Sequence, residues 1–203
     1  MTNNNKHGQF IVLYGANNLG KSTQAKMLIR KLRARGWKVS SFREPSRGPW
    51  GRELRAKAKI AGSLTPAEEL DLFVKDRKDN VARNLRPALD AGHVVVLDRY
   101  YYSTIAYQGA KGLDPEKIRR MNERFAPRPD LVFILDLGAE TGLSRIAGRK
   151  TRDLLFEREA YLRRVRSIFR SFRGRRFVRL DARSGKRELG REILTRALDI
   201  LGG

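Results

Sequence analysis

The sequence of 203 residues contains no cysteine and only two histidines. The absence of cysteine excludes disulfide bonds and thiolate metal sites. No uninterrupted apolar run approaches the roughly 18 residues that a transmembrane helix needs. The first ten residues, MTNNNKHGQF, also lack the apolar core of a secretory signal. We therefore expect a cytoplasmic protein without a membrane segment, in which residues 1–8 form a flexible tail.

Acidic residues are scarce, with 22 Asp and Glu against 44 Lys and Arg, so the net charge is +22. Such a charge predicts attraction to polyanions, whether nucleic acid, phosphorylated substrates or counterions, and does not choose among them. Hydrophobic residues make up 40% of the chain and charged residues 33%, a composition typical of a globular protein. We expect a single domain over residues 9–203.

Short apolar runs alternate with longer stretches of helical periodicity. The expected strands are 9–14, 38–42, 93–97, 131–136 and 176–180. The expected helices are 20–34, 50–61, 66–90, 114–124, 139–148, 157–172 and 187–201. This alternation predicts a doubly wound α/β fold with a parallel sheet, whose ligands lie beyond the carboxyl ends of the strands.

A glycine-bounded loop follows the first expected strand. It reads Gly15, Ala16, Asn17, Asn18, Leu19, Gly20, Lys21, Ser22 and fits G-x-x-x-x-G-K-[ST] between a strand and a helix. The glycines allow backbone N–H groups to surround phosphate at a helix N-terminus. Lys21 would reach the β- and γ-phosphates, and Ser22 would bind Mg²⁺. A chance glycine turn is the alternative, and the position between strand and helix disfavours it.

Arginine follows two further strands, as Arg43-Glu44 and as Asp98-Arg99. The forked guanidinium group of arginine suits phosphate. Asp98 ends an apolar run, as a carboxylate that organises Mg²⁺ and its waters would. The alternative for each arginine is a surface ion pair.

The segment 65–85 begins with a capping-box pattern, Thr65, Pro66 and Glu68. Arg77 falls on its apolar stripe, one turn after Phe73. In one interpretation Phe73 stacks on a base and Arg77 donates to a base oxygen. In the other, the stem of Arg77 covers the core and its charged group lies in water, and spacing alone favours this second interpretation.

Two segments leave their role open. The tyrosine-rich stretch 98–115 could line a pocket or belong to the core. The arginine-rich stretch 145–177 could be a solvated amphipathic helix, a lid carrying Arg149 and Arg152, or a polyanion-binding face.

At these residues the sequence resembles the thymidylate kinase family of nucleoside monophosphate kinases, from Phe10 to about Leu198. The resemblance rests on the phosphate loop, Arg43-Glu44-Pro45, Leu72-Phe73 with Asp76-Arg77, Asp98-Arg99-Tyr100, Ser103 with Ala106-Tyr107-Gln108-Gly109, Arg128-Pro129-Asp130-Leu131, and Gly142 to Arg149. It implies a P-loop NTPase-type five-stranded parallel sheet flanked by helices, a short lid at about 148–157, and a homodimer.

The resemblance also implies an activity, the ATP- and Mg²⁺-dependent phosphorylation of dTMP to dTDP. It assigns ATP binding to Gly15, Ala16, Asn17, Asn18, Leu19, Gly20, Lys21, Ser22 and Thr23, and Mg²⁺ binding to Ser22 and Asp98. Catalytic roles fall to Lys21, Arg43, Asp98, Arg99, Arg149 and Arg152. Substrate binding falls to Glu44, Phe73, Arg77, Ser103, Thr104, Tyr107 and Gln108. Here Phe73 and Arg77 contact the base, which reverses the interpretation favoured by spacing.

The chain departs from the family at one position before the loop and two within it. Tyr14 and Asn17 stand where the family often has Glu and Asp, and Asn18 stands where members carry glycine or an arginine. Without a loop arginine, the lid arginines Arg149 and Arg152 are the candidates for contacting the transferred phosphate. The missing acids and the charge of +22 leave open an alternative function, nucleotide-dependent nucleic-acid binding or phosphorylation of a modified pyrimidine.

Overall fold

The computed structural model describes residues 7–15, 20–60, 62–136 and 152–202, with side chains for all of these except 152–158. The predicted tail at 1–8 therefore lies mostly outside the described residues, as does the helix predicted at 139–148.

The described part of the chain forms one five-stranded sheet, as predicted. Its strands are β1 (Phe10–Gly15), β2 (Val39–Arg43), β3 (Val94–Asp98), β4 (Leu131–Asp136) and β5 (Phe177–Asp181). All neighbouring pairs are parallel, and the order is β2-β3-β1-β4-β5. Because every strand runs the same way, the residues that end β1, β2 and β3 meet at one edge of the sheet.

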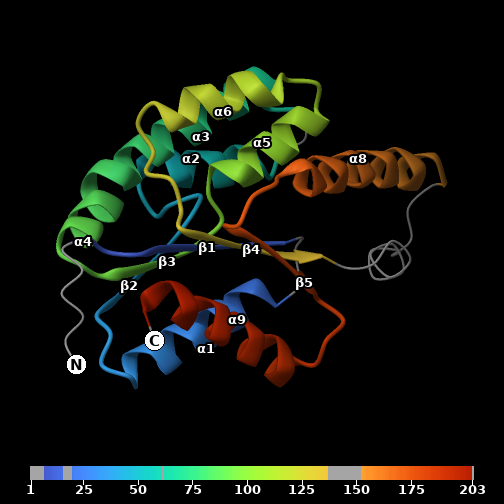
Figure 1. The fold of residues 1–203 in the computed structure, drawn as a ribbon. Coiled ribbons are helices and arrows are strands. Elements are labelled where there is room, and N and C mark those ends of the chain that lie inside the picture. Colours follow the sequence, from blue (N-terminus) through green and yellow to red (C-terminus); the bar gives the residue numbers. More distant parts are fainter. Residues whose placement is uncertain (1–6, 16–19, 61, 137–151, 203) are drawn as a thin grey trace.

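Helices cover both faces of the sheet and make three layers (Figure 1). One face carries α1 (Lys21–Arg33) and α9 (Lys186–Leu201). The other carries α2 (Pro49–Lys57), α3 (Pro66–Asn80), η1 (Val81–Leu85), α4 (Arg86–Asp90), α5 (Tyr101–Ala110), α6 (Pro115–Glu123) and α8 (Arg152–Ser171). Successive side chains of a strand point to opposite faces, so both layers need apolar residues from the same strands.

The core follows this alternation. Ile11 and Leu13 of β1 join the hydrophobic cluster against α1 and α9, whereas Phe10, Val12 and Tyr14 join the cluster on the other face. All five side chains are at most 1% exposed. The continuously apolar strands are therefore buried on both faces, as the sequence predicts.

The segment predicted as one helix over 66–90 is continuous but irregular. Thr65 and Glu68 form the predicted capping box, with the Thr65 amide donating to Glu68 Oε2 at 2.8 Å and the Glu68 amide donating to Thr65 Oγ1 at 3.2 Å. A π-helical turn, η1, then precedes Pro87. Proline lacks an N–H and its ring clashes with the carbonyl four residues earlier, so the wider turn accommodates it.

Two helices differ from the sequence prediction. α5 was not predicted, because Tyr101-Tyr102-Ser103-Thr104-Ile105 contains few strong helix formers. α8 begins at Arg152, five residues before the predicted start. The lid predicted at about 148–157 stays a prediction, since residues 148–151 lie outside the described residues.

The structure shows how the two segments whose role the sequence left undecided, 98–115 and the described part of 145–177, contribute to the core. Tyr101 and Tyr102 are buried, so the tyrosine-rich stretch belongs to the core, while Tyr107 lines a pocket. Val165, Phe169 and Phe172 bury the apolar stripe of the arginine-rich segment. Its described part is thus an amphipathic helix packed on α5.

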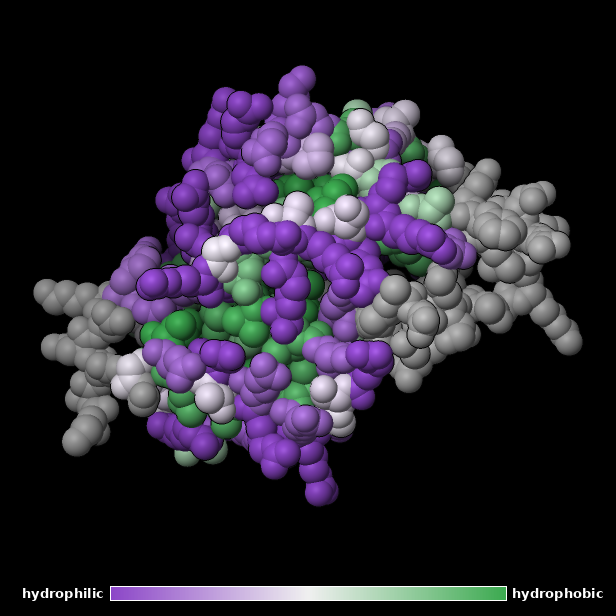
Figure 2. Space-filling model, turned by 45° about the vertical axis from the view of Figure 1, so that its right-hand side comes forward, coloured by the Kyte–Doolittle hydropathy of each residue, from purple (hydrophilic) through white to green (hydrophobic). Residues whose placement is uncertain are grey.

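Hydrophilic residues dominate the face of the molecule that Figure 2 turns to the viewer, with hydrophobic residues reaching the surface only between them. This agrees with a net charge of +22 on a folded domain. Within residues 7–15, 20–60, 62–136 and 152–202, no helix has the length and hydrophobicity to cross a membrane.

Candidate active site

The glycines that bound the phosphate loop have conformations suited to it. Gly20 precedes α1 with a φ of 78°, in the left-handed region that favours glycine. At Gly15, whose φ is 154°, an added Cβ would lie 2.9 Å from the carbonyl oxygen of Leu135. Larger residues at either position would disturb the turn from β1 into α1. Residues 16–19, including the predicted ligands Ala16, Asn17, Asn18 and Leu19, lie outside the described residues.

Ser22 and Asp98 meet across 76 residues of sequence at the carboxyl edge of the sheet. The Ser22 hydroxyl donates to Asp98 Oδ2 at 2.7 Å. The other carboxylate oxygen, Oδ1, is buried without a hydrogen-bond partner among the described residues. A hydroxyl beside a carboxylate with a buried unsatisfied oxygen fits Mg²⁺, a hard cation that prefers oxygen ligands. The described residues contain no group of three His, Asp or Glu side chains placed to bind a metal, so most ligands of such an ion would be phosphate and water.

Lys21, the first residue of α1, is 7% exposed. Burial and the positive charge of Arg99 lower its pKa to about 8, and the negative charge of Asp98 acts in the opposite direction. Burial and Arg99 thus disfavour the charged form of the ammonium group, and phosphate oxygens bound beside it would favour that form.

Arg43 and Arg99 lie at adjacent strand ends, where Arg43 of β2 is in register with Asp98 of β3. Arg43 is exposed and forms no ion pair among the described residues. Arg99 has a φ of 71°, a conformation that costs a non-glycine residue about 1–3 kcal/mol. Its guanidinium carbon lies 5.7 Å from the centre of the Tyr107 ring. The backbone thus turns Arg99 toward the cavity described next.

A cavity of about 280 Å³ opens between α3 and α5. Its lining comprises Glu44, Pro45, Glu69, Phe73, Arg77, Arg99, Tyr100, Ser103, Thr104, Tyr107, Gln108, Lys111 and Tyr161. All seven predicted substrate-binding residues are in this set, together with Arg99. The tertiary structure therefore brings together, in one pocket, residues that are spread over more than sixty positions of the sequence.

Sequence reasoning quoted Pro45 and Tyr100 only as parts of motifs, and it missed Glu69, Lys111 and Tyr161 in this lining. Helical spacing could have indicated Glu69, which lies one turn before Phe73 on the same face of α3. Lys111 follows Gln108 by three residues, but α5 was not predicted. Tyr161 reaches the pocket from α8, and no pattern in the sequence indicates that contact.

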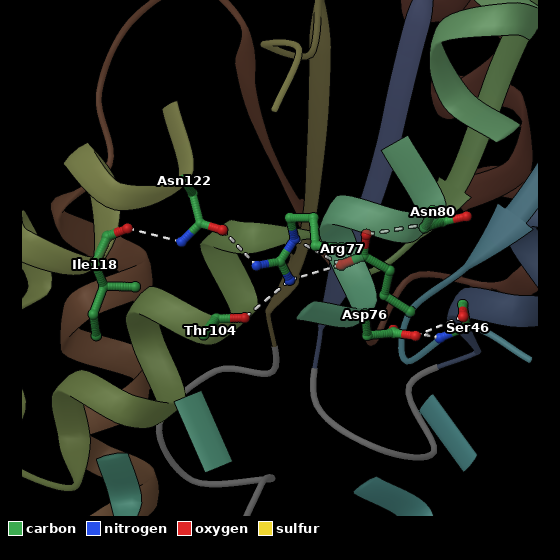
Figure 3. Close-up of polar contacts among 8 residues, drawn as sticks. Ser46, Asp76, Arg77, Asn80, Thr104, Ile118 and Asn122 are labelled. Atoms are coloured by element: carbon green, nitrogen blue, oxygen red, sulfur yellow. Dashed lines mark hydrogen bonds and ion pairs between the residues drawn. The ribbon is translucent and has the colours of Figure 1, made fainter. Parts of the chain in front are cut away.

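Arg77 forms the polar centre beside this pocket (Figure 3). Its Nε and Nη2 donate to Glu44 Oε2 at 2.9 and 2.6 Å, its Nη1 to Asn122 Oδ1 at 2.7 Å, and its Nη2 to Thr104 Oγ1 at 3.1 Å. Asn80 Nδ2 donates to the other Glu44 oxygen at 3.3 Å. Four of the five N–H groups of Arg77 are thus used. The remaining one, on Nη1, has no partner among the described residues.

The interpretation that spacing alone favoured, with the Arg77 guanidinium in water, is wrong. Arg77 is 1% exposed and Glu44 3%. Burial raises the pKa of Glu44, while the charge and hydrogen bonds of Arg77 act to lower it. A buried arginine on the apolar stripe is tolerable because a buried carboxylate and two polar side chains satisfy it.

A second carboxylate fixes the loop after β2. Asp76 accepts hydrogen bonds from the Ser46 amide at 2.7 Å and the Ser46 hydroxyl at 2.6 Å (Figure 3). This ties the segment that carries Arg43 and Glu44 to α3, which carries Phe73 and Arg77. The two walls of the pocket are thereby held in one arrangement.

Tyr14, which stands where the resemblance implies an acidic residue, is not among the residues that line the cavity. Its ring packs against Tyr102 and against Phe169 of α8, with centres 5.9 and 5.8 Å apart. Its hydroxyl is buried without a described partner, and burial raises its pKa well above the ordinary value. The substitution therefore fills the core between β1 and α8.

The predicted lid arginines cannot be placed in this site. Arg149 lies outside the described residues. Arg152 begins α8, but its side chain is among those not described. Their catalytic role stays a prediction.

Comparison with known proteins adds an independent observation. A thymidylate kinase family model matches residues 13–193. The thymidylate kinase of Akkermansia muciniphila is 45% identical over 188 residues, which span 93% of this chain and 90% of the relative. The thymidylate kinase of Brachyspira hyodysenteriae is 42% identical over 92% of each chain. A probable thymidylate kinase of Archaeoglobus fulgidus is 40% identical over 90% of this chain and 91% of its own.

Proposed function

The chain belongs to the thymidylate kinase family, and we propose that its cavity between α3 and α5 binds dTMP while the loop at 15–22 binds ATP. The enzyme phosphorylates dTMP to dTDP with ATP as donor. One observation carries the assignment of the dTMP pocket. All seven residues that the resemblance assigns to the acceptor, from Glu44 to Gln108, line one cavity that extends to Arg99.

On the acceptor side, we assign the 5′-phosphate to Arg99 and Arg43, whose strand ends are adjacent. Arginine binds phosphate through paired charge-assisted hydrogen bonds. Phe73 would stack on thymine, and Tyr107 would lie beneath the sugar. Arg77 would donate its remaining N–H to a carbonyl oxygen of the base. Its four other hydrogen bonds hold the guanidinium group in position for this contact.

On the donor side, Lys21 would bind the β- and γ-phosphates of ATP, and backbone amides of the loop would surround them. Ser22 and Asp98 would hold Mg²⁺, which supplies positive charge to the phosphate oxygens. Phosphoryl transfer needs positioning and charge stabilisation and no covalent enzyme intermediate. We also propose a homodimer and a cytoplasmic location, on the strength of the family resemblance.

An acceptor panel tests this function. We expect ADP release with dTMP to exceed that with dUMP, dCMP and UMP at equal concentration. Absence of turnover with every acceptor would overturn the proposal. A parallel DNA titration at two salt concentrations examines the alternative, since binding through many cations weakens steeply with salt. No contact or cavity of the described residues favours that alternative.

The lowered pKa of Lys21 predicts a pH dependence. Because Lys21 loses its proton near pH 8 in the absence of ligand, kcat/KM for ATP should fall as pH rises through about 8. Bound phosphate favours the ammonium form, so kcat should fall only at higher pH. Lys21→Arg keeps its charge throughout this range, and its kcat/KM profile should lack the fall near pH 8. An identical alkaline fall in both enzymes would contradict the role of Lys21.

A further inference from the structure

Three pocket-lining residues contact one another between α3 and α5. Glu69 lies on α3, Gln108 on α5, and Lys111 directly after α5. Glu69 Oε2 accepts a hydrogen bond from Gln108 Nε2 at 2.7 Å and also contacts the Lys111 ammonium. Glu69 and Lys111 have side-chain exposures of 21% and 35%, whereas Gln108 is only 1% exposed. The Glu69 carboxylate therefore links Lys111, at the rim of the pocket, to Gln108, which is buried in its wall.

These contacts determine which way the Gln108 amide points. A carboxylate oxygen that receives hydrogen bonds from an ammonium acts as an acceptor, so only the NH₂ end of the amide can face it favourably. The carbonyl oxygen must then lie at the opposite end of the amide. That atom, Oε1, is buried and has no hydrogen-bond partner among the described residues. A buried acceptor without a partner is unfavourable unless a ligand supplies a donor.

We propose that Glu69 is a positioning residue for base selection, which holds the Gln108 amide so that its oxygen is the acceptor for an N–H of the nucleobase. This inference rests on the proposed dTMP pocket. Thymine and uracil carry a ring N–H between two carbonyl groups, whereas cytosine has an unprotonated ring nitrogen at that position. A fixed acceptor on the pocket wall therefore selects pyrimidines with a ring N–H over cytosine. Glu69 itself need not touch the substrate.

The physical basis is the cost of an unpaired or repelled polar group in a closed site. With cytosine bound, Gln108 Oε1 would face an unprotonated ring nitrogen, so the hydrogen bond would be lost and the two acceptors would repel each other. This should reject cytosine more strongly than a difference in pocket shape would. If the amide could turn by 180°, its NH₂ would instead face the base and accept cytosine. The acceptor-only character of Glu69 prevents this turn.

Glu69→Gln tests the proposal, because an amide in place of the carboxylate can donate as well as accept. We expect KM for dTMP to rise and the ratio of kcat/KM for dTMP to that for dCMP to fall, each roughly tenfold. The kcat for dTMP and KM for ATP should change less than about twofold, since the proposed phosphate sites do not include Glu69. Asp71→Asn is the matched control. It makes the same change two residues away on α3, in an exposed pair with Lys75 outside the pocket lining, and should leave all of these constants unchanged.

A double variant separates positioning from a general structural effect. Gln108→Met removes the acceptor, and Glu69→Gln added to it should change the dTMP-to-dCMP ratio no further, because Glu69 acts through Gln108. A folded Glu69→Gln enzyme that keeps the parent ratio within about twofold, or a double variant with additive effects, would overturn the inference. Either result would leave the proposed function intact if the parent enzyme phosphorylates dTMP. A parent enzyme without activity on dTMP would overturn both.

Discussion

Lys21→Ala should lower kcat by about 10³-fold while the protein remains folded. The ammonium group is the only cation of the phosphate loop, and it lies beside Ser22 and Asp98 at the site where the γ-phosphoryl group would move. Its lowered pKa shows that the folded protein disfavours the charged form before ligand binds. Removing the charge should therefore not destabilise the fold. Steady-state kinetics and thermal unfolding together measure the two effects.

Lys26→Ala is the control for this prediction. Lys26 lies on the same helix, is exposed, and carries the same charge. Its replacement should leave kcat within about twofold of the parent value. Normal turnover by Lys21→Ala would remove the central assignment of the donor site, and loss of turnover in both variants would point to the overall charge of the helix instead.

Arg77→Met should lower the free energy of unfolding by about 3–5 kcal/mol. The substitution keeps an unbranched apolar stem but removes the guanidinium group, which leaves the Glu44 carboxylate buried without its counter-charge. It also leaves Asn122 Oδ1 without its donor from Arg77. Chemical denaturation measures the loss. The difference from the parent protein should shrink at low pH, because burial raises the pKa of Glu44 and a protonated Glu44 is easier to bury.

A second change distinguishes the lost ion pair from simple loss of packing. Glu44→Gln combined with Arg77→Met removes both charges, so the double variant should be more stable than Arg77→Met alone. The matched control is the exposed pair of Asp71 and Lys75 on α3, where Lys75→Met should cost at most about 1 kcal/mol. A double variant no more stable than Arg77→Met would show that packing around the guanidinium, and not its charge, stabilises this region.

Arg77 also illustrates where sequence reasoning failed. Its position on the apolar stripe was correctly read, and the usual solution for such an arginine is a buried stem with the charged group in water. The structure adopts the rarer solution, in which Glu44, Thr104 and Asn122 satisfy the guanidinium within the protein. These partners lie 33, 27 and 45 residues away in sequence. No local spacing predicts such contacts.

α5 is a helix that the sequence did not predict at all. Its residues have weak helix propensity, and periodicity did not indicate it. Its helical form comes from packing, because Tyr101, Tyr102, Ile105 and Ala106 are all buried against the sheet and neighbouring helices. Tertiary contacts override local propensity in this segment. The omission mattered for the site, since α5 carries Ser103, Thr104, Tyr107 and Gln108.

The sequence by itself determined the five strands, the phosphate loop between β1 and α1, and the acidic and basic residues at the strand ends. These features depend on neighbouring residues, through apolar runs, glycine conformation and the change from strand to helix. Only the tertiary structure decided that Glu44 pairs with Arg77 and that Glu69 accepts a hydrogen bond from Gln108. Burial makes each of those contacts necessary, because a polar group removed from water needs whichever partner the fold brings within reach.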